Sequence, residues 1–260
     1  MATFLFDEII FGPVKSRRLG VSLGINLLPV KRKICNFNCI YCECGWTRDI
    51  EKAISRLPRR HEVYNALERR LNELKEKGPA PDVITYAGNG EPTLHPDFPG
   101  IIDDSLILRD KFFQDARIAV LSNATTITNP LVKAALLKID MNILKLDSAI
   151  EATIRLHNQP RININVEELI NNLAGFNGKV IIQTLFLRGT YKGKVIDNTT
   201  PFEINVWLKA IERIGPSEVM IYTISRDTPK GASLMKVPLH ELKVIASMVE
   251  SIGIKTRVSG

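Results

Sequence analysis

The chain has 260 residues, with 45% hydrophobic and 24% charged side chains, proportions that are ordinary for a soluble globular protein. No apolar run approaches the ~18 residues of a membrane span, which excludes a transmembrane helix. The formal net charge of +7 favours an anionic partner such as RNA, although a basic protein without such a partner is equally compatible with it. Residues 1–8 lack the features of a signal peptide, so we expect a cytoplasmic protein with reduced thiols.

The first predicted strand leads into the stretch around which the chain is organised. Residues 12–20 are glycine-bounded and basic; within them Arg17 and Arg18 are either phosphate or substrate contacts or part of a solvated loop. Apolar and polar residues alternate over residues 21–28, which predicts a strand. The basic residues 31–33 follow, and then a cysteine-rich loop. This loop therefore leaves the C-terminal end of a strand, where α/β barrels place their active sites.

Three cysteines of this loop, Cys35, Cys39 and Cys42, have the spacing C-x3-C-x2-C, and Tyr41 stands directly before the third. Thiolates are soft ligands that select iron–sulfur clusters, zinc or copper. A self-sufficient cubane cluster takes four cysteines, so three ligands leave one iron open for chemistry. Cys44 lies only two residues beyond Cys42, and we expect it not to be a ligand.

A structural zinc site is the main alternative, and the spacing argues against it. Such sites usually combine two separated pairs of ligands, and no second cysteine pair follows this loop. The histidines stand far from the loop and at no ligand spacing: His61, His95, His157 and His240.

The next predicted unit ends in a glycine loop. Apolar residues at helical spacing predict a helix over residues 61–77, and a buried type of strand follows at residues 82–87. The loop after this strand lacks the last glycine of a dinucleotide-binding fingerprint. In it, Gly90 allows close backbone approach to a ligand, and Glu91 supplies a carboxylate that suits a ligand carrying an ammonium group.

Two later strands end in, or carry, polar side chains. The third predicted strand ends in Ser122 and Asn123. Lys145 and Asp147 lie two residues apart on one face of the fourth. Because a charged pair inside an apolar strand is costly unless partnered, it is either a salt bridge or a cation and an anion aimed into the barrel.

The fifth and sixth strands complete the candidate site. Gln183 is a polar outlier in the fifth strand, and the basic segment 188–194 follows it. This segment, which contains Arg188, is a candidate substrate lid, with an ordinary exposed loop as the alternative. The sixth strand runs into Arg226, a further candidate substrate contact.

The predicted elements alternate along the chain. Strands are expected at residues 21–28, 82–87, 117–122, 142–148, 179–187 and 218–224. Helices are expected at residues 61–77 and 96–115, from residue 130, at 166–176, from residue 201, and at 238–251. Repeated βα units imply a parallel sheet with right-handed crossovers, so the fold class is α/β.

These motifs resemble those of the radical S-adenosylmethionine (SAM) superfamily. C-x3-C-x-aromatic-C is similar to its signature, and Gly90-Glu91-Pro92 matches the last three positions of its Gly-Gly-Glu-Pro stretch, with Asn89 replacing the other glycine. The resemblance implies a [4Fe–4S] cluster on the three cysteines, whose open iron binds SAM. An electron from the cluster then yields a 5′-deoxyadenosyl radical that abstracts hydrogen from a substrate. It also implies a partial (β/α)6 barrel, an open TIM-like barrel, over nearly the whole chain.

The same resemblance implies which residues contact the cofactors and the substrate. The expected cofactor contacts are Tyr41, Gly90, Glu91, Ser122, Asn123, Lys145, Asp147 and Gln183. The expected substrate contacts are Arg17, Arg18, Arg188 and Arg226. No residue is assigned a catalytic role in its own right.

Residues 12–24, 88–96 and 145–147 together resemble a compact branch of iron–sulfur oxidoreductases similar to the wyosine-synthesis enzymes of tRNA. We expect one radical SAM domain over residues 1–260: a basic segment (1–20), a barrel core (21–235) and a C-terminal helix and strand (236–260). No cysteine follows Cys44, so no auxiliary cluster is expected, and a ferredoxin or flavodoxin would donate the electron. The substrate hypotheses are tRNA, or a peptide, a protein or a small molecule; a non-catalytic metal-binding module is the alternative of another class.

Overall fold

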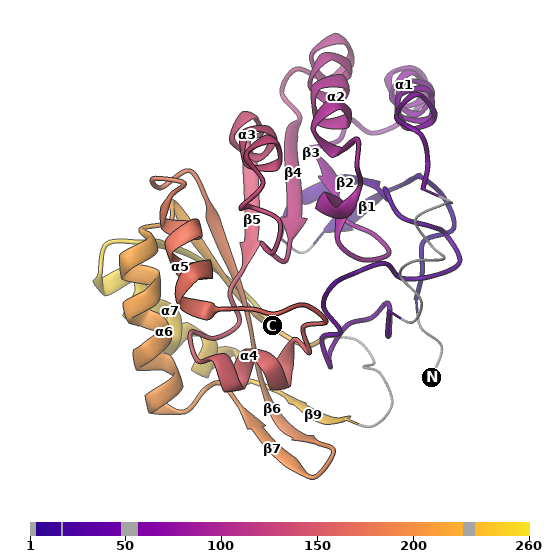
Figure 1. The fold of residues 1–260 in the computed structure, drawn as a ribbon. Coiled ribbons are helices and arrows are strands. Elements are labelled where there is room, and N and C mark those ends of the chain that lie inside the picture. The colour runs from indigo at the N-terminus through magenta and orange to yellow at the C-terminus, as the bar shows by residue number, and fades with distance from the viewer. Residues whose placement is uncertain (1–3, 17, 48–56, 226–231) are drawn as a thin grey trace.

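The computed structural model describes residues 4–16, 18–47, 57–225 and 232–260. A curved, mostly parallel sheet forms its centre, and most helices follow the outer side of that curve (Figure 1). All six predicted strands are present and are neighbours in chain order: β2 (Gly20–Ile25), β3 (Val83–Tyr86), β4 (Arg117–Ser122), β5 (Met141–Lys145), β6 (Ile181–Tyr191) and β8 (Glu218–Thr223). Each is parallel to the next, which confirms an open α/β sheet.

The predicted helices are confirmed, and their apolar stripes and caps account for them. They are α1 (Arg60–Lys77), α2 (Phe98–Phe112), α3 (Pro130–Lys138), α5 (Val166–Ala174), α6 (Pro201–Ile214) and α7 (Leu239–Ser251). The apolar stripe of α1 is buried, and Asn129 caps α3 by accepting a hydrogen bond from the Leu131 backbone N–H. No described helix is long and apolar enough to cross a membrane.

Other elements depend on partners far away in the chain. The C-terminal strand β10 (Lys255–Ser259) is confirmed and runs parallel to β8. The remaining elements are not predicted from the sequence: β1 (Ile10–Ser16), β7 (Lys194–Asp197), β9 (Ala232–Lys236), α4 (Glu151–His157) and the short 3-10 turn η2 (Pro92–Leu94). The first of these strands is antiparallel to β2 and forms one edge of the sheet.

The prediction of a loop over residues 188–194 is wrong. β6 continues to Tyr191, and its C-terminal half pairs antiparallel with β7 on one side and β9 on the other. We call β7, β9 and residues 187–191 the arm. At Gly189, where φ is +140°, a Cβ would lie 2.0 Å from the Ser233 carbonyl oxygen, so the pairing requires glycine. Local composition resembles a loop here because the pairing partner β9 lies more than 40 residues away.

Arg257 links the two edges of the sheet. Arg257 of β10 donates from Nη1 to the carbonyl oxygen of Arg18 at 2.6 Å, and its Nε lies 2.8 Å from the Glu218 carboxylate on β8. The backbone of Arg18 is thereby held against the opposite end of the sheet. Arg18 therefore lies beside the paired strands β8 and β10.

Candidate active site

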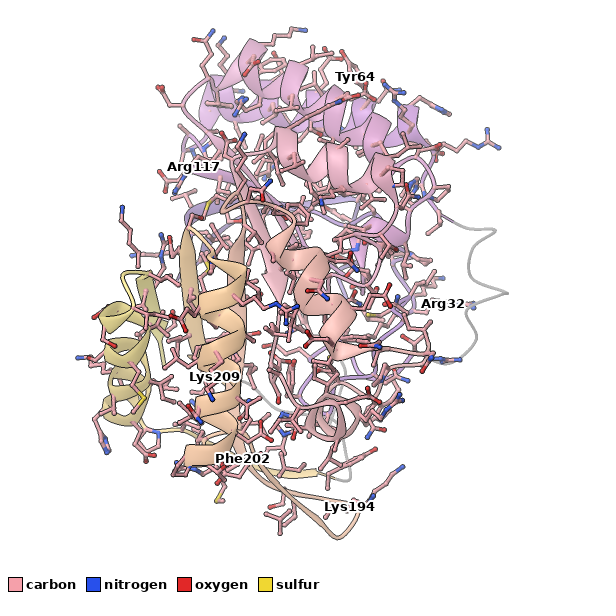
Figure 2. All side chains as sticks on the ribbon, turned by 60° about the vertical axis from the view of Figure 1, so that its left-hand side comes forward. Arg32, Tyr64, Arg117, Lys194, Phe202 and Lys209 are labelled. Atoms are coloured by element: carbon pink, nitrogen blue, oxygen red, sulfur yellow. The ribbon has the colours of Figure 1, made fainter. Side chains whose placement is uncertain are left out.

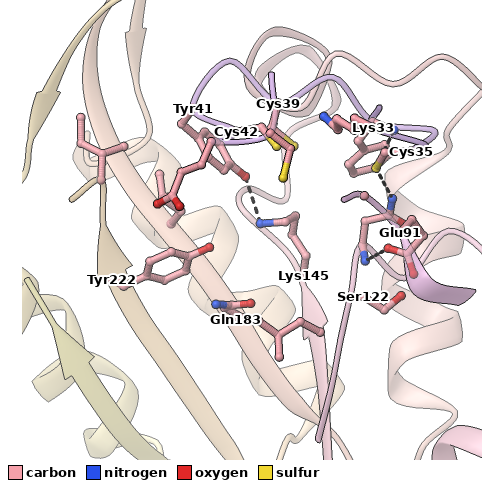
Figure 3. Close-up of a pocket in the computed structure, with 18 of the residues that line it drawn as sticks. Lys33, Cys35, Cys39, Tyr41, Cys42, Glu91, Ser122, Lys145, Gln183 and Tyr222 are labelled. Carbon is pink, nitrogen blue, oxygen red and sulfur yellow. Dashed lines mark hydrogen bonds between the residues drawn. The ribbon is translucent and has the colours of Figure 1, made fainter. Parts of the chain in front are cut away.

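A cavity of about 320 Å³ lies where the parallel strands end. Figure 3 shows the cysteine loop on one side of it and the ends of β5, β6 and β8 on the other. The predicted site residues that line it are Arg18, Cys35, Cys39, Tyr41, Cys42, Gly90, Glu91, Ser122, Asn123, Lys145 and Gln183. Asp147 and Arg188 do not line it, and Arg17 and Arg226 lie outside the described residues.

The cysteine loop is attached to the glycine loop after β3 through backbone hydrogen bonds. The Ile34 N–H donates to the Asn89 carbonyl at 2.9 Å, and the Glu91 N–H donates to the Ile34 carbonyl at 2.9 Å. At Gly90, φ is +137°, and a Cβ would lie 1.7 Å from the Ile34 carbonyl oxygen. Glycine is therefore required for the two loops to approach this closely.

The other side of the cysteine loop rests on the end of α4. The Ile40 N–H donates to the His157 carbonyl at 2.9 Å, and Phe37 pairs with Pro160 through an isolated β-bridge. Cys35 and Cys39 are buried as a result, and burial raises the pKa of the Cys35 thiol to about 12. These thiols stay protonated unless a metal replaces the proton.

Cys42 and Cys44 have a different environment. A hydrogen bond from the Cys44 thiol lowers the pKa of Cys42, with a further contribution from the nearby Lys33 ammonium. Cys44 also lines the cavity, and its sulfur lies 3.4 Å from the Gly88 carbonyl oxygen. The Cys44 thiol thus faces the same space as the three candidate ligands.

Lys33 is a site residue that the sequence analysis did not single out. Its side chain is buried and its Nζ donates to the Gly45 carbonyl oxygen at 3.0 Å, which ties the two ends of the cysteine loop together. Burial lowers the pKa of Lys33, but the sulfurs of Cys42, Cys35 and Cys39 outweigh this effect and raise it overall. The sequence signal was a lysine two residues before the first cysteine.

Glu91 is enclosed by hydrogen-bond donors. It is 2% exposed and accepts hydrogen bonds from the Asn123 N–H at 2.6 Å and the Thr93 N–H at 3.1 Å. Burial raises the pKa of Glu91, and these donors partly oppose that effect. A carboxylate held in this way at the cavity wall can receive an ammonium group.

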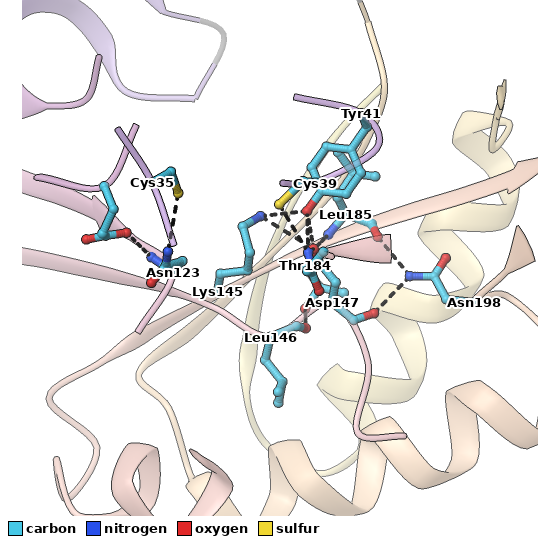
Figure 4. Close-up of polar contacts among 12 residues, drawn as sticks. Cys35, Cys39, Tyr41, Asn123, Lys145, Leu146, Asp147, Thr184, Leu185 and Asn198 are labelled. Carbon is cyan, nitrogen blue, oxygen red and sulfur yellow. Dashed lines mark hydrogen bonds and ion pairs between the residues drawn. The ribbon is translucent and has the colours of Figure 1, made fainter. Parts of the chain in front are cut away.

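Lys145 and Asp147 belong to a polar network behind the cysteine loop, drawn in Figure 4. The Tyr41 hydroxyl donates to the Asp147 carboxylate, and Lys145 Nζ lies 3.0 Å from the Tyr41 oxygen and 3.5 Å from Asp147. The Asn158 amide donates to Asp147 at 2.6 Å and to the Cys39 sulfur at 3.4 Å. Lys145 and Asp147 therefore form the salt bridge that was one of the two alternatives. Lys145 lines the cavity, and Asp147 contacts Lys145 from outside the cavity lining.

The arginine candidates have separate environments. The Arg18 guanidinium lies 4.5 Å from the Tyr222 ring centroid, and its Nη1 is buried without an acceptor among the described residues. Arg188 lies on the arm, where its guanidinium pairs with Glu241 at 2.5 Å and with Asp197 at 3.5 Å. Of the two arginine candidates that the structure describes, Arg18 is the one with an unpaired donor beside the cavity.

A family model shows which family the chain belongs to. The model of the radical SAM superfamily matches residues 32–190, which include the cysteine loop, the glycine loop and the Lys145 strand. The chain belongs to the radical SAM superfamily. Radical SAM proteins bind a [4Fe–4S] cluster and S-adenosylmethionine, so the chain is a radical SAM enzyme whose reaction type is open.

The sequence matches to curated relatives extend beyond residues 32–190. A UPF0026 protein of Methanocaldococcus jannaschii is 30% identical over 94% of this chain and 72% of its own length. A UPF0026 protein of Helicobacter pylori is 30% identical over 84% of this chain and 67% of its own. A GTPase Obg of Brachyspira hyodysenteriae is also 30% identical, but the match spans only 30% of that protein.

Solved radical SAM structures share the fold at low sequence identity. A methyltransferase from Sphaerobacter thermophilus gives a TM-score of 0.68 at 13% identity, covering 92% of this chain and 65% of that one. SuiB of Streptococcus suis bound to S-adenosylmethionine gives 0.57 at 14% identity over 91% and 46%. Archaeal TYW1 gives 0.54 at 15% identity over 88% and 71%. The partial TIM-barrel form of the open sheet is thereby confirmed.

The sulfurs fit the radical SAM cluster better than a single metal ion. Among the described residues, no group of three histidine, cysteine or acidic side chains converges as ligands of one ion would. In a cubane, each thiolate binds a different corner, so its ligands are spread apart. Three cysteines around one cavity, without a fourth at equivalent spacing, suit a cluster with one open iron.

Several lining residues were missed by the sequence analysis. They are Lys33, Phe37, Glu43, Cys44, Gly88, Leu121, Leu185, Tyr222, Thr223, Ile224 and Ser225. Tyr222 to Ser225 follow the rule that strand ends face the site, which the sixth predicted strand could have revealed. The role of Asn158 had no sequence signal, because nothing near it marks α4 as a wall of the site.

Proposed function

We propose that Cys35, Cys39 and Cys42 hold the [4Fe–4S] cluster and that the adjoining cavity binds S-adenosylmethionine. The observation that carries this proposal is that the three cysteines and the buried Glu91 line one cavity. When bound, these groups supply a 5′-deoxyadenosyl radical, which abstracts hydrogen from a substrate. The chain itself supplies orientation, charge and exclusion of water.

The polar residues around the cavity suggest where each part of S-adenosylmethionine is held. Glu91 offers its carboxylate to the amino group, and Gly90 leaves room for this close approach. Lys145 offers a cation to the carboxylate of the methionine moiety. Further polar groups for the ribose and the base come from the next strand ends: Ser122, Asn123 and Gln183. Tyr41 and Asp147 orient Lys145.

The test is cluster reconstitution without oxygen, followed by addition of S-adenosylmethionine and a reductant and by measurement of 5′-deoxyadenosine. Cys35→Ala, Cys39→Ala and Cys42→Ala should each reduce its formation to background. Cys44→Ala is the matched control, because its sulfur lies in the same cavity, and it should remain active. Loss of the cluster in Cys44→Ala would contradict this ligand assignment. An intact cluster that yields no 5′-deoxyadenosine would favour the non-catalytic module.

For the substrate we propose tRNA, on the basis of positive charge near the cavity. Lys31 and Arg32 are exposed at the start of the cysteine loop, and Lys192 and Lys194 are exposed at the turn of the arm. Arg32 and Lys194 extend outward from the same side of the molecule (Figure 2). Each segment comes after the C-terminal end of a parallel strand, and the cavity lies at that same end of the sheet. The unpaired Nη1 of Arg18 adds a hydrogen-bond donor at the cavity.

tRNA binding can be separated from the peptide, protein or small-molecule alternative by its salt dependence. Release of counterions makes the logarithm of an RNA affinity fall linearly with the logarithm of salt concentration. We expect a steep fall for this protein and a shallower slope for Lys192→Gln combined with Lys194→Gln. An affinity for tRNA that does not change with salt, or no affinity at all, would redirect the search to peptides and small molecules.

Radical SAM enzymes require an electron donor, and we propose an external ferredoxin or flavodoxin. All four cysteines of the sequence lie between residues 35 and 44. Within these 260 residues there is consequently no second set of thiolate ligands that could hold a relay cluster. Reduction by a purified flavodoxin system should support 5′-deoxyadenosine formation in place of a chemical reductant.

A further inference from the structure

Polar side chains from outside the cysteine motif surround the candidate cluster sulfurs. The neighbours come from the loop after β4, from the end of α4 and from the segment before the first cysteine, and all present N–H groups. Asn123 contacts Cys35 at 3.5 Å and Asn158 contacts Cys39 at 3.4 Å, while Lys33 lines the same cavity as Cys42 and its Nζ bonds to the Gly45 carbonyl oxygen at 3.0 Å. Hydrogen bonds to the sulfurs are among the factors that set the reduction potential of an iron–sulfur cluster.

Lys33 differs from the two asparagines because it brings a full charge. It is 4% exposed, and its hydrogen bond to the Gly45 carbonyl oxygen holds the ammonium at the cysteine loop. No ion pair within 4 Å joins Lys33 to an acidic side chain in the part of the chain that the structure describes. A buried charge is costly unless opposite charge lies close by. Cysteine thiolates that bind the cluster would supply this opposite charge beside Lys33.

We propose that Lys33 raises the reduction potential of the cluster, and that Asn158 acts in the same direction. The proposal rests on the proposed function, because it requires the cluster at Cys35, Cys39 and Cys42. Reduction moves one electron from the external donor to the cluster and adds one negative charge there. A cation in a site of low dielectric stabilises that added charge more strongly than it would in water. Electron entry thereby becomes easier for a donor of given potential.

The test is a redox titration of the reconstituted protein, followed by the electron paramagnetic resonance signal of the reduced cluster. Lys33→Gln removes the charge but keeps a donor for Gly45. We expect about a tenfold lower ratio of reduced to oxidised cluster at a given potential, which is ~59 mV for a one-electron couple. Lys33→Arg keeps the charge and should stay within about threefold of the wild type.

Two further variants sharpen the comparison. Lys31→Gln removes an exposed lysine two residues away and should leave the potential unchanged, because solvent screens that charge. Asn158→Ala removes an uncharged donor and should lower the potential by less than Lys33→Gln does. Iron content is measured for every variant, since a tuning role leaves the three cysteine ligands intact.

The outcomes separate this proposal from the proposed function. Equal potentials in the wild type and Lys33→Gln would overturn the role of Lys33, and so would a variant that no longer holds iron. An equal shift in Lys31→Gln would also overturn it, because net charge would then explain the effect. A wild-type protein that takes up no cluster would instead remove the proposed function itself.

Discussion

Glu91 is the residue whose chemistry is most narrowly defined by its surroundings. Backbone N–H groups of Thr93 and Asn123 orient the carboxylate at the cavity wall. Glu91→Gln keeps the size of the side chain and removes its charge. A hydrogen bond to a charged group contributes about 1.5–3 kcal/mol, so we expect S-adenosylmethionine to bind at least ~10-fold more weakly.

Equilibrium dialysis of the reconstituted protein measures this affinity directly. Asp97→Asn is the control, because Asp97 is exposed and does not line the cavity. An unchanged dissociation constant in Glu91→Gln would show that the amino group is held elsewhere.

The burial of His157 makes the free energy of unfolding depend on pH in the acidic range. Burial lowers the pKa of this histidine from its usual value of 6.5 to about 4. The folded state therefore binds fewer protons than the unfolded state, and stability falls as pH drops below 6.5, until it levels off near pH 4. From pH 7 to pH 5, His157 alone should reduce the free energy of unfolding by about 2 kcal/mol.

Urea denaturation at both pH values tests this, with His157→Gln as the comparison. The variant lacks the titrating ring, so its stability should fall less between pH 7 and pH 5. The idea is wrong if the wild type and the variant lose the same free energy over this interval.

At the scale of elements, the arm is a small sheet attached to the main one through β6. Its pairing with β9 depends on Gly189, where any side chain would meet the Ser233 carbonyl oxygen. We expect Gly189→Ala to separate β9 from β6 and to cost about 1–3 kcal/mol. Hydrogen exchange should become faster at the Leu234 amide and stay unchanged at amides of β5.

Thr190→Ala is the matched control, because Thr190 is exposed and its backbone already suits a side chain. If Gly189→Ala left the exchange of the arm amides as slow as in the wild type, the close backbone approach would not determine the pairing.

At the scale of the whole molecule, we propose that residues 1–260 form one domain, as expected from the sequence. One continuous sheet connects β1 to β10, and Arg257 joins its two ends by bonding to Arg18 and Glu218. Unfolding of the cluster-free protein in urea should therefore be a single transition. Circular dichroism and the fluorescence of Trp46 and Trp207 should report the same midpoint. Two separated midpoints would divide the chain into independent units.

The sequence by itself determined the parallel strands, the amphipathic helices and the cysteine loop. These features are encoded in short windows: an alternating or helical period, a capping residue such as Asn129, and the spacing of thiols along one loop. Glu91 was found because it follows a predicted strand within a glycine loop, and Lys145 because a charged pair is costly inside an apolar strand.

Tertiary structure alone decided what surrounds these residues. The cavity residue Tyr222 lies about 180 residues from the cysteine loop, and Asn158 reaches Cys39 across 119 positions. Such contacts depend on which distant segments the fold brings together, and no periodicity or motif in a local window records them. The different positions of Lys145 and Asp147 also depend on the fold. Lys145 lines the cavity, whereas Asp147 is buried outside its lining. The residues that carry the chemistry were local in sequence, while the charges and donors that tune them came from elsewhere in the fold.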